Sequence, residues 1–168
     1  MSFLPERVDS SRFVRSEVEE PTPSSAGVNV LRGQLVRCSS FWENGFEGFH
    51  AVDGNLSADN YGKDADWQSQ RPGKNQWLKI YLPRTVSISR IRMLNASAQS
   101  AYRTREYAIS VSTDDVHYDE IARGTLPDDG TTWTELHLAA TRVRYLRFTG
   151  VTGYNLAYAV GLKEIEAY

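Results

Sequence analysis

The sequence of 168 residues contains a single cysteine, Cys38, and this scarcity excludes two common structural devices. One cysteine cannot form an intrachain disulfide, and it cannot supply a thiolate cluster for a metal. No stretch approaches the roughly 20 apolar residues that a membrane-spanning helix requires. Residues 1–20 carry charges throughout and lack the apolar core of a secretory signal peptide. We therefore expect a soluble chain that is made in the cytosol.

The sequence also lacks a concentration of charge of either sign. Nineteen basic and 21 acidic residues give a net charge of −2, and they are interspersed without a polybasic run. Neither nucleic acid nor an anionic membrane is therefore an expected partner. The three histidines have no metal or triad spacing, and neither a nucleophile-elbow nor a P-loop motif occurs. The sequence therefore offers no catalytic constellation of these kinds.

Strand signals dominate from about Val28 onward. Leu78, Ile80 and Leu82 alternate onto one face, and the apolar phase shifts between Ile88 and Ile91, which predicts a bulge. No amphipathic helix of ten or more residues is visible. Short strands separated by Gly, Asp and Asn turns predict an all-β protein, an antiparallel β-sandwich of the jelly-roll type. The expected strands are 28–37, 76–82, 86–94, 106–112, 116–122, 133–138, 142–150 and 161–168, with a hairpin turn at Asp114-Asp115.

Residues 1–27 differ in composition from the rest of the chain. They are polar, carry three prolines, and contain an acidic cluster of Glu17, Glu19 and Glu20. This segment is expected to be an extended N-terminal arm or linker, preceding a sandwich domain over 28–168. Two hypotheses remain open for it, a flexible leader and an arm that docks on a partner chain.

One loop, HAVDGNLSADNYGKDADWQS at 50–69, gathers four aspartates together with amide and hydroxyl oxygens. Hard oxygen ligands of this kind suit Ca²⁺, which takes six to eight of them. A pair among Asp59, Asp64 and Asp66 could instead serve a glycosidase. A third hypothesis is a solvated loop tied by Asx-turns. Phe49 and Trp67, which flank the loop, are expected in the core.

Seven motifs, in order, resemble the discoidin or coagulation-factor C-type domains and the family 32 carbohydrate-binding modules. They are CSSFWENGFEGFHAVDGN, DWQS, QWLKIYL, SRIRML, REYAISVSTDDVHYDEIARG, RVRYLRFTG and GLKEIEAY. They cover residues 29–168. The resemblance implies a galactose-binding-like jelly roll that acts as a binding module rather than an enzyme.

The resemblance also implies a structural Ca²⁺ in the loop at 50–69. The ligands carried over are Asp53 and Asn55 of the Asp-Gly-Asn motif and Glu164 of the last strand. Ser57 or Asp66 would fill a position where the family usually has a hydroxyl. The inserted segment ADNYGKDA is where this chain departs from the family pattern.

Ligand loops of this family cluster at one end of the sandwich, where aromatic rings stack on sugars and Arg, Asn or Gln bind hydroxyls. Three loops here have such content, FWENGFEGF, NASAQSAYRTR and TGYNLAYA. The predicted binding residues are Trp42, Asn44, Phe46, Asn95, Gln99, Tyr102, Arg103, Tyr154 and Asn155. Phospholipid binding through Trp42 and Phe46 is the weaker option, because the sequence has no basic residues close by.

The expected function is a non-catalytic carbohydrate-binding module for glycan recognition or adhesion, with a glycan or glycoprotein surface as its partner. The alternative is a structural or interaction subunit of a larger assembly, such as a phage or virion attachment component, docked through residues 1–27. Both imply action outside the cell or on a particle surface.

Overall fold

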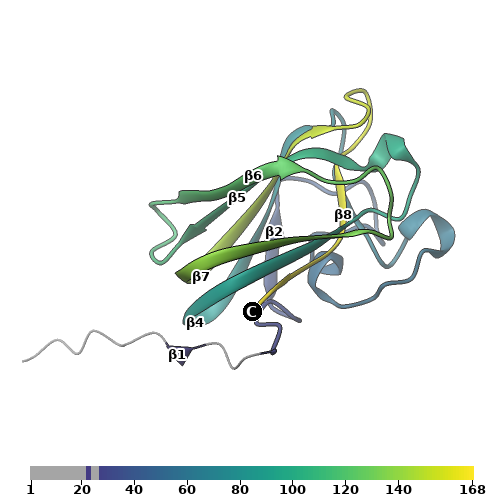
Figure 1. The fold of residues 1–168 in the computed structure, drawn as a ribbon. Helices are drawn as coiled ribbons and strands as arrows, with labels where there is room; N and C mark the ends of the chain where they lie inside the picture. Colours follow the sequence, from purple (N-terminus) through teal and green to yellow (C-terminus); the bar gives the residue numbers. More distant parts are fainter. Residues whose placement is uncertain (1–21, 24–26) are drawn as a thin grey trace, which may run out of the picture.

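The computed structural model describes residues 22–23 and 27–168, and within them the chain folds as strands joined by loops (Figure 1). Its helical segments are three short 3₁₀ helices, η1 (Gly48–Val52), η2 (Asp59–Gly62) and η3 (Ser100–Tyr102). The all-β prediction is therefore confirmed. The strands are β1 (Thr22–Pro23), β2 (Leu35–Cys38), β3 (Trp67–Gln68), β4 (Lys74–Asn95), β5 (Thr104–Ser112), β6 (Asp119–Thr125), β7 (Trp133–Gly153) and β8 (Gly161–Ala167).

The two long strands, β4 and β7, each contribute to both layers of a sandwich. The first half of β4 pairs with β2 and with the second half of β7, and the β5–β6 hairpin extends this first layer. The register of β4 breaks between Tyr81 and Val86. Beyond the break, β4 pairs with β8 and with the first half of β7, and β3 completes the second layer at the edge of β8. The predicted antiparallel jelly-roll sandwich is confirmed.

The core lies between these layers and follows the alternation read from the sequence. Leu78, Ile80 and Leu82 are 0%, 0% and 4% exposed. Trp67 is fully buried, with its ring edge-on to Phe148 at 6.4 Å between centroids. Burying an aromatic side chain of 150–250 Å² stabilises the fold by on the order of 4 kcal/mol.

Two local predictions are confirmed and one is wrong. The register of β4 against β7 shifts between Ile88 and Arg90, which is the predicted bulge. β5 and β6 form the predicted hairpin, with Asp115 in the left-handed region at its turn. Phe49 was expected in the core but is 50% exposed. Its neighbours in η1 face inward, and its ring lies outside against that of His50 at 4.2 Å.

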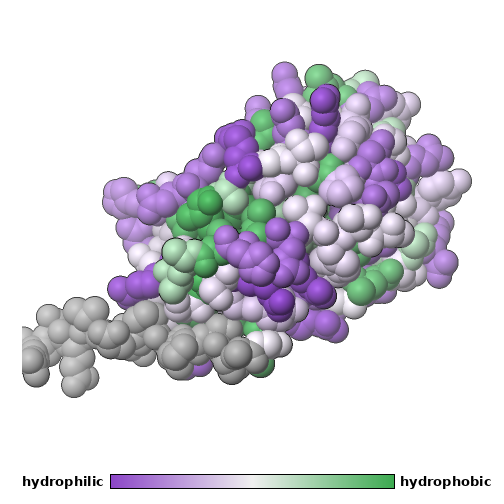
Figure 2. Space-filling view, viewed as in Figure 1, coloured by the Kyte–Doolittle hydropathy of each residue, from purple (hydrophilic) through white to green (hydrophobic). Residues whose placement is uncertain are grey.

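The beginning of the sandwich domain and the end of the chain lie side by side (Figure 1). The N–H of Val30 donates to the carbonyl of Ala167 at 2.9 Å. The predicted arm, 1–27, falls largely outside the described residues. Of this segment, Thr22–Pro23 is described as a strand, and it pairs in parallel with Val86–Ser87. On the face shown in Figure 2, a small group of hydrophobic residues is surrounded by hydrophilic ones. No helix in the described ranges is long and apolar enough to cross a membrane.

Candidate functional site

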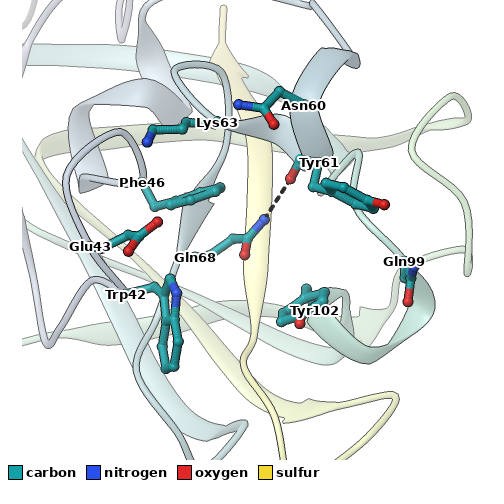
Figure 3. Close-up of a pocket in the computed structure, with 9 residues that line it drawn as sticks. All are labelled: Trp42, Glu43, Phe46, Asn60, Tyr61, Lys63, Gln68, Gln99 and Tyr102. Atoms are coloured by element: carbon teal, nitrogen blue, oxygen red, sulfur yellow. Dashed lines mark hydrogen bonds between the residues drawn. The ribbon is translucent and has the colours of Figure 1, made fainter.

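Loops from three parts of the chain meet at one end of the sandwich and enclose a hollow of about 430 Å³. In Figure 3 the amide of Gln68 lies at its centre, with Trp42 and Tyr102 on either side of it. The loops are 39–47, 58–66 and 96–103, and β3 supplies the floor between them. The lining residues are Trp42, Glu43, Phe46, Asn60, Tyr61, Lys63, Gln68, Gln99 and Tyr102.

The first loop is held to β3 by backbone hydrogen bonds. The N–H of Trp42 donates to the carbonyl of Gln68 at 2.8 Å, and the N–H of Gln68 donates to the carbonyl of Phe46 at 3.3 Å. Phe46 is only 7% exposed and lines the bottom of the hollow, whereas Trp42 is 45% exposed. Of these two rings, that of Trp42 is presented to solvent and that of Phe46 supports the loop.

The second loop holds an aromatic residue in an unfavourable backbone conformation. Asn60, Tyr61 and Gly62 follow one another in the left-handed region, with φ of 50°, 57° and 82°. This conformation costs roughly 1–2 kcal/mol for a residue with a Cβ. The side-chain amide of Gln68 donates to the carbonyl of Tyr61 at 3.0 Å and stabilises it (Figure 3). The result is a tyrosine that is 64% exposed at the rim of the hollow.

A second hollow, of about 390 Å³, adjoins the first. The two share Asn60, Tyr61 and Gln99, so Tyr61 stands between them. Arg103 lines the second hollow and is fixed by its own bonds, from Nε to the carbonyl of Ala96 at 3.1 Å and from Nη1 to the carbonyl of Asp128 at 2.9 Å. The remaining residues that line the second hollow are Ala58, Ser97 and Ala98.

An arginine joins the aromatic residues beside the first hollow. The guanidinium of Arg71 lies 5.1 Å from the ring centroid of Trp42 and 4.5 Å from that of Tyr158. The rings of Tyr158 and Tyr102 meet edge-to-face at 5.6 Å. The sequence-based premise that no basic residue lies near Trp42 is therefore wrong, because Arg71 approaches it from the loop after β3.

The structure brings some of the predicted ligand residues together and separates others. Trp42, Phe46, Gln99 and Tyr102 line the first hollow, and Arg103 lines the second. The other three loop residues line neither. Asn44 is exposed to solvent, Tyr154 donates its hydroxyl to the carbonyl of Leu126 at 2.7 Å, and Asn155 accepts from the N–H of Ala157.

Asn95 lies in the interior, at 1% exposure, rather than at the binding surface. Its amide group donates to the carbonyls of Thr104 and Pro127, each at 2.8 Å. Its oxygen accepts from the N–H groups of Ala96 and Thr104 at 3.0 and 3.1 Å. With all of these bonds made inside the protein, Asn95 shapes the loop that carries Gln99 and Tyr102.

Several lining residues were not among the predicted ligands. Asn60, Tyr61 and Lys63 belong to the inserted segment that departs from the family pattern, and Gln68 belongs to the DWQS motif. Tyr61 lies between Asn and Gly in a polar loop, and this sequence pattern indicates an exposed aromatic residue that could contact a ligand. Glu43 was visible in the first loop, where its position between two aromatic residues points to the same surface.

Two of the predicted calcium ligands, Asp53 and Glu164, lie at the same loop. Oε2 of Glu164 accepts from the N–H of Gly54 at 3.0 Å, while its Oε1 is buried and has no hydrogen-bond partner. Burial raises the pKa of Glu164 to about 8, and the carboxylate of Asp53 adds to the effect. Oδ2 of Asp53 lies 2.8 Å from Nδ1 of His50. A buried carboxylate oxygen without a donor, near a second carboxylate, fits a hard cation.

The other three predicted ligands are engaged elsewhere. Asn55 and Ser57 each accept a local bond from the N–H two residues ahead, as Oδ1 of Asp53 also does, and this is the pattern of the Asx-turn hypothesis. Asp66 is fully buried and accepts from the N–H and hydroxyl of Ser97 at 2.6 and 2.9 Å, and burial raises its pKa to about 6. Across the described part of the chain, no three His, Cys, Asp or Glu side chains gather as a metal cluster.

Solved structures with a similar fold include several carbohydrate-binding modules. Chitosan-binding module 2 of a Paenibacillus sp. IK-5 chitosanase/glucanase, in complex with chitotriose, is 27% identical, with a TM-score of 0.67 and coverage of 83% of this chain and 99% of that one. A family 32 module from Clostridium perfringens, in complex with GalNAc-β-1,3-galactose, is 16% identical, with a TM-score of 0.71 and coverage of 84% and 99%. A fucose-binding module from Streptococcus pneumoniae is 17% identical, with a TM-score of 0.67 and coverage of 84% and 94%.

Sequence comparison supplies the family. The search of curated proteins gave no match. The family model described as the F5/8 type C domain matches residues 35–163, which includes every strand from β2 to β7 and the residues of both hollows. This chain belongs to the F5/8 type C, or discoidin, domain family.

Proposed function

We propose that this protein is a non-catalytic carbohydrate-binding module and that its first hollow binds a sugar of a glycan or glycoprotein. The observation that carries the proposal is the arrangement of Trp42, Tyr61 and Tyr102 around the buried amide of Gln68. A pyranose ring has an apolar face that stacks on an aromatic ring, and hydroxyls that need directional partners. The hollow offers both kinds of contact.

The polar lining suits neutral hydroxyl groups. Asn60, Gln68 and Gln99 are planar amides that can each donate and accept, and the opposite charges of Glu43 and Lys63 offset each other. Within a site that excludes part of the solvent, such bonds to hydroxyls discriminate between sugar epimers, because a misplaced hydroxyl leaves a buried partner unpaired. A neutral sugar unit is the ligand that these groups fit best.

The second hollow favours an oligosaccharide over a single sugar. Because Tyr61 borders both hollows, a chain of two or more units could lie across it, with the second unit near Arg103. Similar solved modules support this idea, since those in complex with chitotriose and with GalNAc-β-1,3-galactose hold chains of more than one sugar.

The carboxylates at the site support a binding role rather than hydrolysis. Glu43 is the one acidic residue among the described residues that line the two hollows. Glycosidases generally use a pair of carboxyl groups separated by roughly 5–10 Å across the sugar. A single exposed carboxylate fits hydrogen bonding to a hydroxyl or an amino group of the ligand.

The same proposal includes a structural Ca²⁺ near the binding end. Asp53 and Glu164 would hold it, with backbone and water oxygens completing the shell. Support comes from Oε1 of Glu164, which is buried without a partner. The ion would tie the loop after η1 to β8, which pairs with β3 beneath the hollow.

A glycan array of the full chain tests the function. Trp42→Ala and Tyr61→Ala each remove a ring that is about half exposed or more, and loss of aromatic stacking worth about 0.5–1.5 kcal/mol predicts a 3- to 10-fold weaker Kd. Phe49→Ala is the matched control, because Phe49 is 50% exposed and lies outside both hollows. An array without a positive glycan, or unchanged affinity in both variants, would overturn the assignment.

A further inference from the structure

Three cationic side chains stand in a row across the outward face of the first layer. The strand register places Arg37 of β2 opposite Lys79 of β4, and Lys79 opposite Arg147 of β7. The residues that alternate with them, such as Leu78 and Ile80, are fully buried in the core. Arg37, Lys79 and Arg147 therefore project together from the opposite face of this layer.

Like charges at directly opposed positions destabilise a sheet, because their Cβ atoms are only about 4.5–5.5 Å apart. The row has one anionic partner among the described residues, Asp115 of the β5–β6 turn, whose Oδ1 lies 2.7 Å from Nζ of Lys79. Nε of Arg147 is buried and has no hydrogen-bond partner. With one anionic partner for three cations, the row thus retains net positive charge.

Aromatic rings frame this cationic row. The guanidinium of Arg147 lies 4.6 Å from the ring centroid of Tyr118, and Nζ of Lys79 lies 5.0 Å from that of Tyr81. Tyr81 is paired with Tyr145, ring edge against ring face at 5.6 Å. Between Trp77, Lys79, Tyr118 and Arg147 there is a small depression of about 70 Å³. Its size suits a single anionic group rather than a whole sugar.

We propose that this face is a second binding site, which takes the carboxylate or sulfate groups of an acidic polysaccharide. The guanidinium forks match such planar or tetrahedral oxyanions, and the neighbouring rings offer a surface for the sugars that carry them. Because the whole chain has a net charge of −2, attraction for a polyanion depends on local positive charge, which this row supplies. The site shares no residue with either hollow, and it stands whether or not the hollow binds a neutral sugar.

The experiment measures the Kd of the full chain for two soluble probes, dextran sulfate for sulfate and polygalacturonate for carboxylate, with neutral dextran as the uncharged probe. Arg147→Gln and Lys79→Gln each remove one charge from the row. Arg123→Gln is the matched control, because Arg123 is 56% exposed and already paired with Glu120 at 2.8 Å. Trp42→Ala changes the first hollow alone, so it tests whether the acidic probes bind there instead of at the cationic row.

We expect at least one acidic probe to bind, dextran not to bind, and each row variant to raise the Kd by 10-fold or more. Arg123→Gln and Trp42→Ala should leave that Kd within 2-fold. Absence of binding to both acidic probes at low salt would overturn the proposal. So would an equal loss in Arg123→Gln, or tighter binding to polyglutamate or DNA than to either polysaccharide. Arg147→Gln relieves like-charge repulsion and is expected not to lower the melting temperature, whereas Lys79→Gln also loses the ion pair with Asp115 and is expected to lower it slightly.

Discussion

Replacing Asn95 by alanine should unfold much of the loop that carries Gln99 and Tyr102. The change removes four hydrogen bonds of a buried side chain, those with the carbonyls of Thr104 and Pro127 and with the N–H groups of Ala96 and Thr104. At about 1 kcal/mol for each bond, the free energy of unfolding should fall by about 4 kcal/mol. A typical domain has only about 5–15 kcal/mol to lose.

Urea unfolding, followed by the fluorescence of the four tryptophans, measures this loss. The melting temperature should fall by about 10 °C, given roughly 2–4 °C per kcal/mol at this chain length. Asn155→Ala is the control, since Asn155 is exposed and accepts one local bond, and its cost should stay near 0.5 kcal/mol. A loss below about 1 kcal/mol in Asn95→Ala would refute the reasoning. Weaker glycan binding at full stability would instead make Asn95 a direct ligand.

Three further predictions concern the loop between η1 and β3 and Glu164 of β8, which accepts from the N–H of Gly54 in that loop. Gly62→Ala should cost about 3 kcal/mol in thermal unfolding, because Gly62 has φ of +82° and a Cβ there would lie 2.0 Å from Oδ2 of Asp66; a cost under 1 kcal/mol would contradict the geometry. Tyr61→Gly relieves left-handed backbone strain and should change the free energy of unfolding by less than about 1 kcal/mol. The affinity for the glycan, measured by calorimetry, should fall. Unchanged affinity would show that Tyr61 does not contact the glycan. Glu164 has its pKa raised by burial from 4.5 to about 8, so the folded state holds the proton more tightly than the unfolded state. The stabilisation by protonated Glu164 is therefore full below about pH 4.5 and is lost as the pH rises through 8, so the melting temperature should decline over this range. Glu164→Gln should flatten the decline. Ca²⁺ should raise the melting temperature of the unmutated protein but not that of Glu164→Gln.

The strands were predictable because alternation of apolar residues is a local signal. Leu78, Ile80 and Leu82 fall on the buried face for the reason read from the sequence, and the phase shift after Ile88 marks the bulge. Phe49 was not predictable in the same way. It sits in a 3₁₀ helix between inward-facing neighbours, and periodicity of two carries no information there.

The binding site was predictable in part. Trp42 and Tyr102 stand out as aromatic residues in polar loops, and both line the hollow. Asn95 has the same local appearance, but the groups that bury its amide, at Thr104 and Pro127, come from 9 and 32 residues further along the chain. Tyr61 was missed because its position depends on a run of left-handed residues that only the folded loop reveals.

Strand β8 runs from the binding end of the sandwich to the opposite end, where Val30 and the last residues of the chain lie. Gly161 pairs with Gln68 beneath the hollow, and Ala167 bonds to Val30 at the opposite end. Seven extended residues span about 20 Å. A protein immobilised on a bead or sensor chip through a tag after Tyr168 would therefore hold the hollow away from the support and open to solution. Attachment through Lys63, which lines the hollow, would instead hold the hollow against the support and block ligand binding.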